Sequence, residues 1–194
     1  DKKIVDPMVL ADMKLAAETP TDVILFNIDS KSETNGKQNK DAIVNVFLKV
    51  FNQMQGFCGS IPHVADLERR LSEEGRYDEF KAAFEEEYGE PWEDSRQDFD
   101  FIQDSVVDVL VSMDFMSEAA ARNWCEKAVE PYTISIEDFA KRVKAYIDRK
   151  GNNHHVVFLV DEIGQYIGDD SKLMLNLQTV TEELGKECMG KAWV

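Results

Sequence analysis

The feature that most constrains the fold is an apolar run that ends in two adjacent carboxylates. Residues 156–160 are all apolar, and Asp161 and Glu162 follow them directly. A short unbroken run rich in Val and Phe predicts a strand of a parallel sheet that is covered on both faces. Ligands of open parallel sheets bind just beyond the carboxyl ends of the strands. The sequence therefore predicts an acidic site at the end of a buried strand.

The order of the two acids is typical of the Walker B strand of an ATPase. In that motif the Asp holds Mg²⁺, directly or through water, and the following Glu polarises the water that attacks the nucleotide. This interpretation makes Asp161 the candidate metal ligand and Glu162 the candidate catalytic residue. The alternative is that the pair merely ends a strand.

Further patterns predict a parallel sheet with helices around it. Residues 23–29 form a second apolar run with a polar end, followed by a Ser-, Lys-, Asn- and Gly-rich loop over residues 30–39, and residues 191–194 begin a third strand. Helical spacing and capping residues predict helices over residues 6–18, 43–54, 135–150 and 173–184. Gly185 is expected to stop the last of these helices.

The middle of the chain has a different character. Residues 57–131 are charged and carry helical spacing without a strand pattern, and the stripe of Phe80, Phe84 and Tyr88 is typical of a helix face packed in a core. A parallel crossover normally contains one helix, whereas several are predicted here. We therefore expect a helical insertion over residues 57–131, flanked by residues 1–56 and 132–194 as parts of one α/β core. Because the chain stops inside a predicted strand, we expect a piece of a larger domain.

The charge balance excludes some partners. The chain has 38 acidic and 22 basic residues, a net charge of -16, which repels phosphate backbones. We therefore expect no direct binding of nucleic acid. The acidic runs of the insertion are interpreted as solvated helix faces or as a docking face for a basic partner. No arginine finger is assigned, and every arginine considered is interpreted as a solvated helix charge: Arg69, Arg70, Arg76, Arg96, Arg122, Arg142 and Arg149.

Cysteine and histidine usage does not predict a structural metal site. Cys58, Cys125 and Cys188 have no CxxC spacing, so neither structural zinc nor a disulfide framework is expected. Adjacent His154 and His155 would point to opposite faces of a strand and are interpreted as residues that lead into it. Without a signal peptide or an apolar run of membrane-spanning length, we expect a soluble cytoplasmic protein with no membrane contact.

A phosphate-binding loop is missing from the sequence. Residues 185–191 match GxxxxGK, but Ala192 replaces the Ser or Thr that should reach Mg²⁺. The segment also lies between a predicted helix and a strand, the reverse of the arrangement that a phosphate loop requires. Either the loop lies upstream of Asp1, or the Walker B interpretation is wrong.

The apolar run and its surroundings resemble a known family. Residues 157–168, VFLVDEIGQYIG, continuing through residues 173–179, LMLNLQT, resemble the Walker B region of the large P-loop ATPase component of bacterial BREX phage-defence systems. Residues 22–57 are similar to the same family. The resemblance implies an α/β fold, a partial AAA-like P-loop NTPase sheet with a large all-helical insertion, and an internal fragment of a very large protein.

The resemblance also implies roles for residues and partners. Asp161 would be the Mg²⁺-associated acid and Glu162 the hydrolytic base, with ATP and Mg²⁺ as cofactors of the parent protein. Other BREX-system proteins, or further copies of the parent, would be its partners. Residues 191–194 would begin the strand that often carries a polar sensor residue. Because the Walker A loop has no counterpart, the isolated chain is predicted to be inactive.

Three functions are consistent with the sequence. The favoured one is a fragment of an ATPase that couples hydrolysis to assembly or remodelling of an antiviral complex. The alternatives are a non-catalytic interaction module and a nucleotide-gated switch that hydrolyses ATP slowly. Removing the charge of Glu162 discriminates among them, because it should trap ATP in an enzyme, alter ATP residence in a switch, and change nothing in a scaffold.

Overall fold

The chain divides into two compact units. The computed structural model describes residues 6–31 and 41–194. The first unit, here called the sheet unit, comprises Asp1–Phe47 and Ile134–Val194, and the second, the helical unit, comprises Leu48–Thr133. The sequence placed the insertion at residues 57–131, whereas the compact units divide inside helix α3 (Ala42–Met54).

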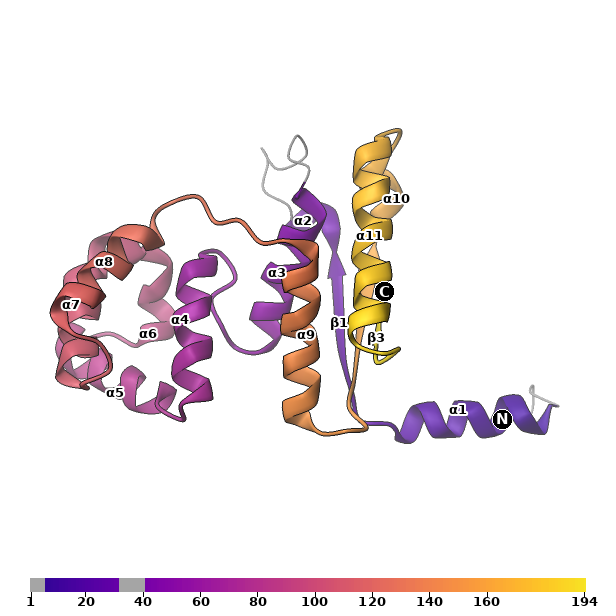
Figure 1. The fold of residues 1–194 in the computed structure, drawn as a ribbon, viewed down its shortest axis with the longest axis horizontal. Coiled ribbons are helices and arrows are strands. Elements are labelled where there is room, and N and C mark those ends of the chain that lie inside the picture. Colours follow the sequence, from indigo (N-terminus) through magenta and orange to yellow (C-terminus); the bar gives the residue numbers. More distant parts are fainter. Residues whose placement is uncertain (1–5, 32–40) are drawn as a thin grey trace. The chain divides into compact units, whose positions relative to one another are not determined.

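The sheet unit is built on three parallel strands (Figure 1). They are β1 (Thr21–Asn27), β2 (His155–Asp161) and β3 (Ala192–Trp193), in the order β1-β2-β3. The predicted α/β class and parallel pairing are therefore confirmed. The register pairs Asn27 with Asp161 and Val156 with Ala192, so the acid pair follows the central strand.

Helices α3 and α9 (Ile136–Lys150) cover one face of this sheet. Phe47 of α3 lies 5.5 Å from Phe26 and 5.1 Å from Phe158 between ring centroids, and Phe139 of α9 lies 6.2 Å from Phe158. Helix α11 (Ser171–Glu187) packs against α9 and contacts β3. Burying these aromatic rings supplies much of the apolar free energy that holds the strands together.

The opposite face of the sheet is open in the described part of the chain. Val23, Leu25 and Leu159 are 56%, 73% and 47% exposed, respectively. The prediction that the strands are covered on both faces is therefore wrong for this structure. Side chains alternate along a strand, and the rings of Phe47 on α3 and Phe139 on α9 contact the face that carries Phe26 and Phe158.

Capping residues define several helix ends as the sequence predicts. Asp6 caps α1 (Pro7–Glu18), where its Oδ1 accepts a hydrogen bond from the Met8 amide at 2.9 Å. Ser135 caps α9, where its Oγ accepts from the Asp138 amide at 3.0 Å. Each cap satisfies an amide that has no partner within its helix.

Two predicted boundaries shift. The strand expected over residues 23–29 ends at Asn27, because α2 (Ile28–Lys31) follows directly. Gly185 does not stop α11, which continues to Glu187 and closes where the Gly190 amide donates to the Gly185 carbonyl at 2.9 Å. The left-handed residue that this closure needs is Met189, with φ 50°, and Gly190 after it also has a positive φ of 74°. Residues 32–40, most of the predicted polar loop, lie outside the described residues.

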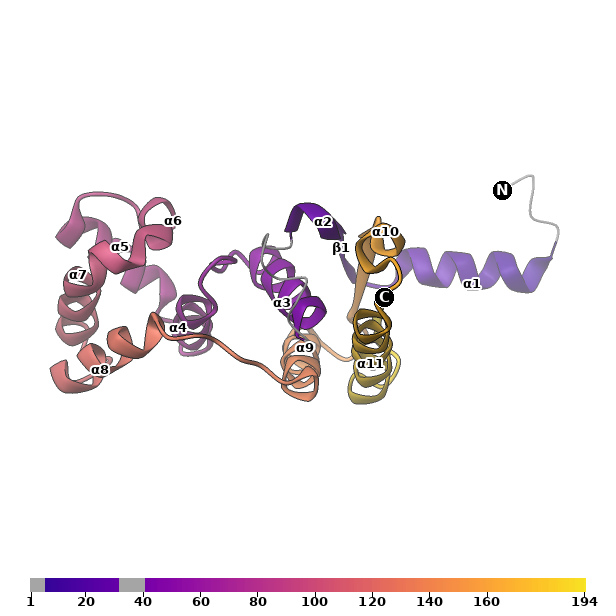
Figure 2. The ribbon, with the colours of Figure 1, turned by 90° about the horizontal axis from the view of Figure 1, so that it is seen from above.

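Beyond the last residues of α3, the helical unit contains the helices between α3 and α9 (Figure 2). They are α4 (Pro62–Glu73), α5 (Tyr77–Tyr88), α6 (Trp92–Ser95), the 3₁₀ turn η2 (Arg96–Asp98), α7 (Phe99–Ser112) and α8 (Glu118–Ala128). Trp92 lies at its centre, 5.0 Å from both Phe80 and Phe84 between ring centroids. Phe80 and Phe84 are fully buried, so the predicted core role of this stripe is confirmed for them, whereas Tyr88 is exposed.

The cysteines are buried free thiols. Burial raises the pKa of Cys125 and of Cys188 to about 11, which keeps both thiols protonated and unreactive near neutral pH.

Within residues 6–31 and 41–194, no helix is both long enough and apolar enough to cross a membrane.

Candidate functional site

Asp161 and Glu162 form the junction between β2 and the short helix α10 (Ile163–Ile167). Glu162 has φ 60° and ψ 17°, a left-handed conformation that is uncommon for a residue with a side chain. Its carbonyl accepts hydrogen bonds from the Gln165 and Tyr166 amides, both at 3.1 Å, which begins α10. The chain thus turns sharply at the end of the central strand and leaves both acidic side chains exposed.

Hydrogen bonds fix the orientation of the acid pair. Oδ1 of Asp161 accepts from the Glu162 amide at 2.9 Å. Oε2 of Glu162 accepts from Nδ2 of Asn27 at 2.8 Å, although the two residues are 135 positions apart in sequence. Asn27 is the last residue of β1 and pairs in register with Asp161. Three polar side chains from two neighbouring parallel strands therefore meet at one edge of the sheet.

The geometry of Asp161 fits a water-rich magnesium site. Mg²⁺ in proteins keeps several waters and takes one or two carboxylates together with phosphate oxygens. The side chain of Asp161 is exposed, and its Oδ2 makes no hydrogen bond or ion pair in the described part of the chain. No group of three or more His, Cys, Asp and Glu residues suited to a metal occurs among the described residues. A magnesium ion at Asp161 would therefore need ligands from a nucleotide.

The GxxxxGK segment lies at the other edge of the sheet. Gly185 is inside α11, and Met189 and Gly190 make the turn that leads into β3. The Lys191 carbonyl accepts from the Val156 amide at 2.9 Å, near the start of β2. Asp161 is five residues further along β2, a rise of about 17 Å. The segment therefore does not cradle phosphates beside Asp161.

A second polar cluster joins β1, β2 and α9 at the amino edge of the sheet. Nε2 of His154 lies 2.7 Å from Oδ2 of Asp22, and the Tyr146 hydroxyl donates a hydrogen bond to the same oxygen. Burial by itself raises the pKa of Asp22. The hydrogen bonds from Tyr146 and His154 and the positive charges of His154 and Lys150 outweigh burial, so the pKa of Asp22 lies below its ordinary value. Burial and the bond to Asp22 raise the pKa of Tyr146. His154 leads into β2 as predicted, and it also ties the strands to α9.

We expect Asp22→Asn to destabilise the sheet unit by about 1 kcal/mol at neutral pH, because it weakens two hydrogen bonds to a carboxylate. A lowered carboxyl pKa contributes stability above the ordinary value near 4 and loses it as the pH falls through the lower folded value. The difference from the native chain should therefore shrink in acid. Urea unfolding across pH tests this, with Asp12→Asn on exposed α1 as the control. An equal loss at all pH values would contradict the assignment.

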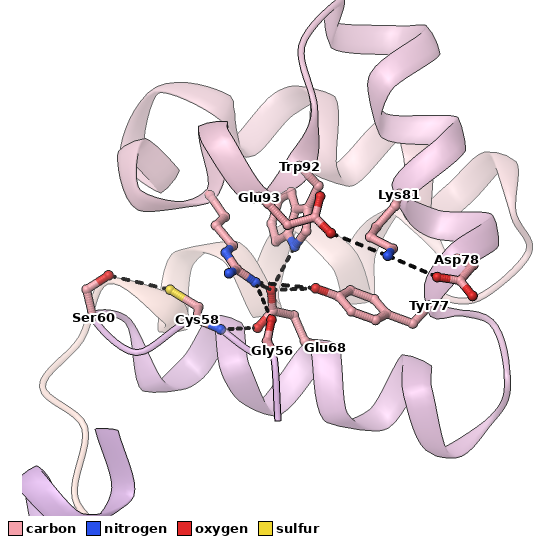
Figure 3. Close-up of polar contacts among 10 residues, drawn as sticks. Gly56, Cys58, Ser60, Glu68, Tyr77, Asp78, Lys81, Trp92 and Glu93 are labelled. Carbon is pink, nitrogen blue, oxygen red and sulfur yellow. Dashed lines mark hydrogen bonds and ion pairs between the residues drawn. The ribbon is translucent and has the colours of Figure 1, made fainter. Parts of the chain in front are cut away.

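The helical unit holds a buried carboxylate that the sequence interpretation missed (Figure 3). The Glu68 side chain has no exposed surface and accepts hydrogen bonds from four groups. Its Oε1 accepts from the Tyr77 hydroxyl at 2.9 Å, Trp92 Nε1 at 2.8 Å and Arg96 Nη1 at 2.6 Å, and its Oε2 accepts from the Cys58 amide. Both carboxylate oxygens are engaged, so this cluster stabilises the unit and has no oxygen left for a ligand.

Two arginines of the helical unit are not the solvated charges that the sequence suggested. The Arg96 side chain is 15% exposed and pairs with Glu68. Burial lowers the pKa of Arg96, but the charge of Glu68 and its hydrogen bond outweigh burial and raise it. Arg69 is also largely buried, where it pairs with Asp66 at 2.6 Å and donates to Asn52. The signal for the cluster was Glu68 itself, which sits on the apolar face of α4 between Val64 and Leu71.

No protein-family model matches this chain, and no solved structure gives a significant match.

Proposed function

We propose that this chain is the Walker B part of an AAA-like P-loop ATPase, with Asp161 as the magnesium-associated acid and Glu162 as the base. The observation that carries the proposal is the position of the pair at the carboxyl end of the central parallel strand, where Asn27 of the neighbouring strand holds Glu162. Ligands of parallel α/β sheets bind at this edge. The sequence resemblance to the ATPase component of BREX systems supports the same proposal.

The roles follow from the chemistry of each side chain. Mg²⁺, when bound, would neutralise charge on the phosphates of the nucleotide. Asp161 would hold the ion, directly or through a water, with its exposed carboxylate oxygen. Glu162 accepts a proton from, or orients, the attacking water, and Asn27 limits the directions in which the Glu162 carboxylate can point. Asn27 is thus a positioning residue for the proposed base.

The proposal requires a phosphate-binding loop from elsewhere in a parent protein. This chain offers carboxylates but no glycine-rich loop between a strand and a helix, and carboxylates alone repel a triphosphate. We propose that the parent is a cytoplasmic ATPase of an antiviral system, which couples hydrolysis to assembly or remodelling of a complex with other proteins of that system or with further copies of itself.

The test compares this chain with a longer polypeptide of the parent that includes its phosphate loop. We expect the isolated chain to show no ATP turnover, and the longer one to bind and hydrolyse ATP only with Mg²⁺. Asp161→Asn in the longer polypeptide should weaken the affinity for ATP in the presence of Mg²⁺ by roughly tenfold or more. ATP turnover by the pure isolated chain would refute the proposal. So would an unchanged affinity for ATP and Mg²⁺ in the Asp161→Asn variant.

Removing the side-chain amide of Asn27, which holds Glu162, should lower the rate of ATP hydrolysis and leave nucleotide binding unchanged. For Asn27→Ala in the longer polypeptide we expect kcat to fall about tenfold, because a base that is free to rotate is less often in position. KM for ATP should stay the same, since Asn27 makes no contact proposed for the nucleotide. Asn153→Ala, in the turn before β2, is the matched control. A higher KM with unchanged kcat would contradict the positioning role.

A further inference from the structure

The negative charge of the chain is concentrated in the helical unit. Residues 48–133 contain 20 acidic and 8 basic residues, a net charge of -12 out of -16 for the whole chain. A charge of this size attracts basic partners over distances near the Debye length, about 8 Å at physiological ionic strength.

Most cations of the helical unit are already committed to other acids. On its surface, Arg70 pairs with Glu74, Arg76 with Glu79, Lys81 with Asp78 and Glu93, and Arg122 with Asp104 and Glu118. Arg69 and Arg96 pair in the interior. Few positive charges therefore remain to neutralise acids elsewhere on the unit.

A groove between α5 and α7 keeps its acids unpaired. It has a volume of about 390 Å³ and is lined by Ala83, Glu86, Glu87, Asp108, Val109 and Ser112. Val109 is buried and Ala83 half-buried, whereas the three carboxylates are exposed, so the floor is apolar and the rim is acidic. Within the described part of the chain, neither glutamate nor Asp108 forms an ion pair.

Two large apolar side chains are exposed elsewhere along α7. Phe101 is 87% exposed and lies seven residues, about two helical turns, before Asp108, while Val111 lies about one turn after it. Positions at these spacings share one face of a helix. An aromatic side chain left this exposed on the helix that lines a groove is typical of an anchor point in a protein interface.

We propose that this acidic groove, together with Phe101, binds an amphipathic segment of a partner protein that carries Lys or Arg on both sides of an aliphatic side chain. The aliphatic group would contact Ala83 and Val109, and the cations would pair with Glu86, Glu87 and Asp108. The inference does not depend on ATP hydrolysis, because the groove lies wholly within the helical unit. The charge that attracts such a segment repels nucleic acid.

The test is calorimetric titration of the whole chain with a short synthetic amphipathic peptide of Lys, Leu and Ala. We expect saturable binding at physiological salt, and at least about tenfold weaker binding for the double variant Glu87→Gln, Asp108→Asn. Ala83→Gln, which fills the groove without changing its charge, should weaken binding as much. Circular dichroism verifies that each variant is folded.

The matched control removes the same charge elsewhere on the unit. Glu90→Gln with Glu126→Gln should change the affinity less than about twofold, since neither residue lines the groove. An equal loss in the control and groove variants would show general electrostatic attraction and overturn the proposal. Absence of saturable binding, or full affinity in Ala83→Gln, would overturn it as well.

Discussion

Glu162→Gln should lower ATP turnover by the phosphate-loop-containing parent by roughly 10²- to 10⁴-fold, the usual contribution of a positioned general base. The amide has nearly the shape of the carboxylate but cannot take a proton. It can still accept the hydrogen bond that Asn27 donates to Oε2, so the junction between β2 and α10 should keep its structure. ATP should remain bound, because Asp161 and the phosphate loop are unchanged. Steady-state hydrolysis and nucleotide retention after gel filtration measure the two effects separately.

The control for this prediction is Glu182→Gln, on the exposed face of α11, which should leave turnover unchanged. Unchanged turnover in Glu162→Gln itself would mean that the acid pair only ends a strand. The groove of the helical unit would then be the first place to look for the role of the chain.

The largest effect on stability is expected at the buried carboxylate of the helical unit. Glu68→Leu would leave Arg96, Trp92 Nε1 and the Cys58 amide without their shared acceptor. Breaking a buried ion pair by removing one partner typically costs about 3–5 kcal/mol. We expect a loss of that size in the free energy of unfolding of residues 48–133. Urea denaturation and amide hydrogen exchange measure this loss.

Two further variants separate the ion pair from the general effect of a substitution. Glu126→Leu on α8, where the side chain is exposed, should cost less than about 1 kcal/mol. Adding Arg96→Leu to Glu68→Leu should restore part of the lost stability, because the uncompensated charge is removed. The 2.6 Å contact indicates that the two side chains are energetically coupled. If the double variant loses as much free energy of unfolding as the two single variants added together, they are not coupled.

Local patterns were enough to predict most elements of the sheet unit. The apolar run before Asp161 is β2, the earlier run is β1, and Asp6 and Ser135 cap the helices that follow them. These features depend on neighbouring residues along the chain, so a single sequence contains the information. The position of Asp161 and Glu162 at a carboxyl edge follows from the same patterns.

Features that depend on distant partners could not be predicted. The hydrogen bond from Asn27 to Glu162 requires the parallel register of β1 and β2, which no local pattern specifies. Arg96 looks like an ordinary surface cation until the fold places it against Glu68. Gly185 resembled a helix stop, but the helix continues past it and turns left-handed at Met189, a residue type that gives no such signal in the sequence. The exposed side of β1 likewise depends on which segments pack on it.

The long separation between β1 and β2 bears on the order in which the chain folds. Pairing Asn27 with Glu162 closes a loop of 135 residues, which in a disordered chain costs about 4 kcal/mol of entropy. The helical unit lies entirely inside this loop and is held by contacts between helices close in sequence, which form quickly. Its early collapse would shorten the effective loop and lower the entropic cost of pairing β1 with β2. The helical unit would thus speed formation of the sheet. Slow sheet formation would then be the step at which exposed strands are open to aggregation.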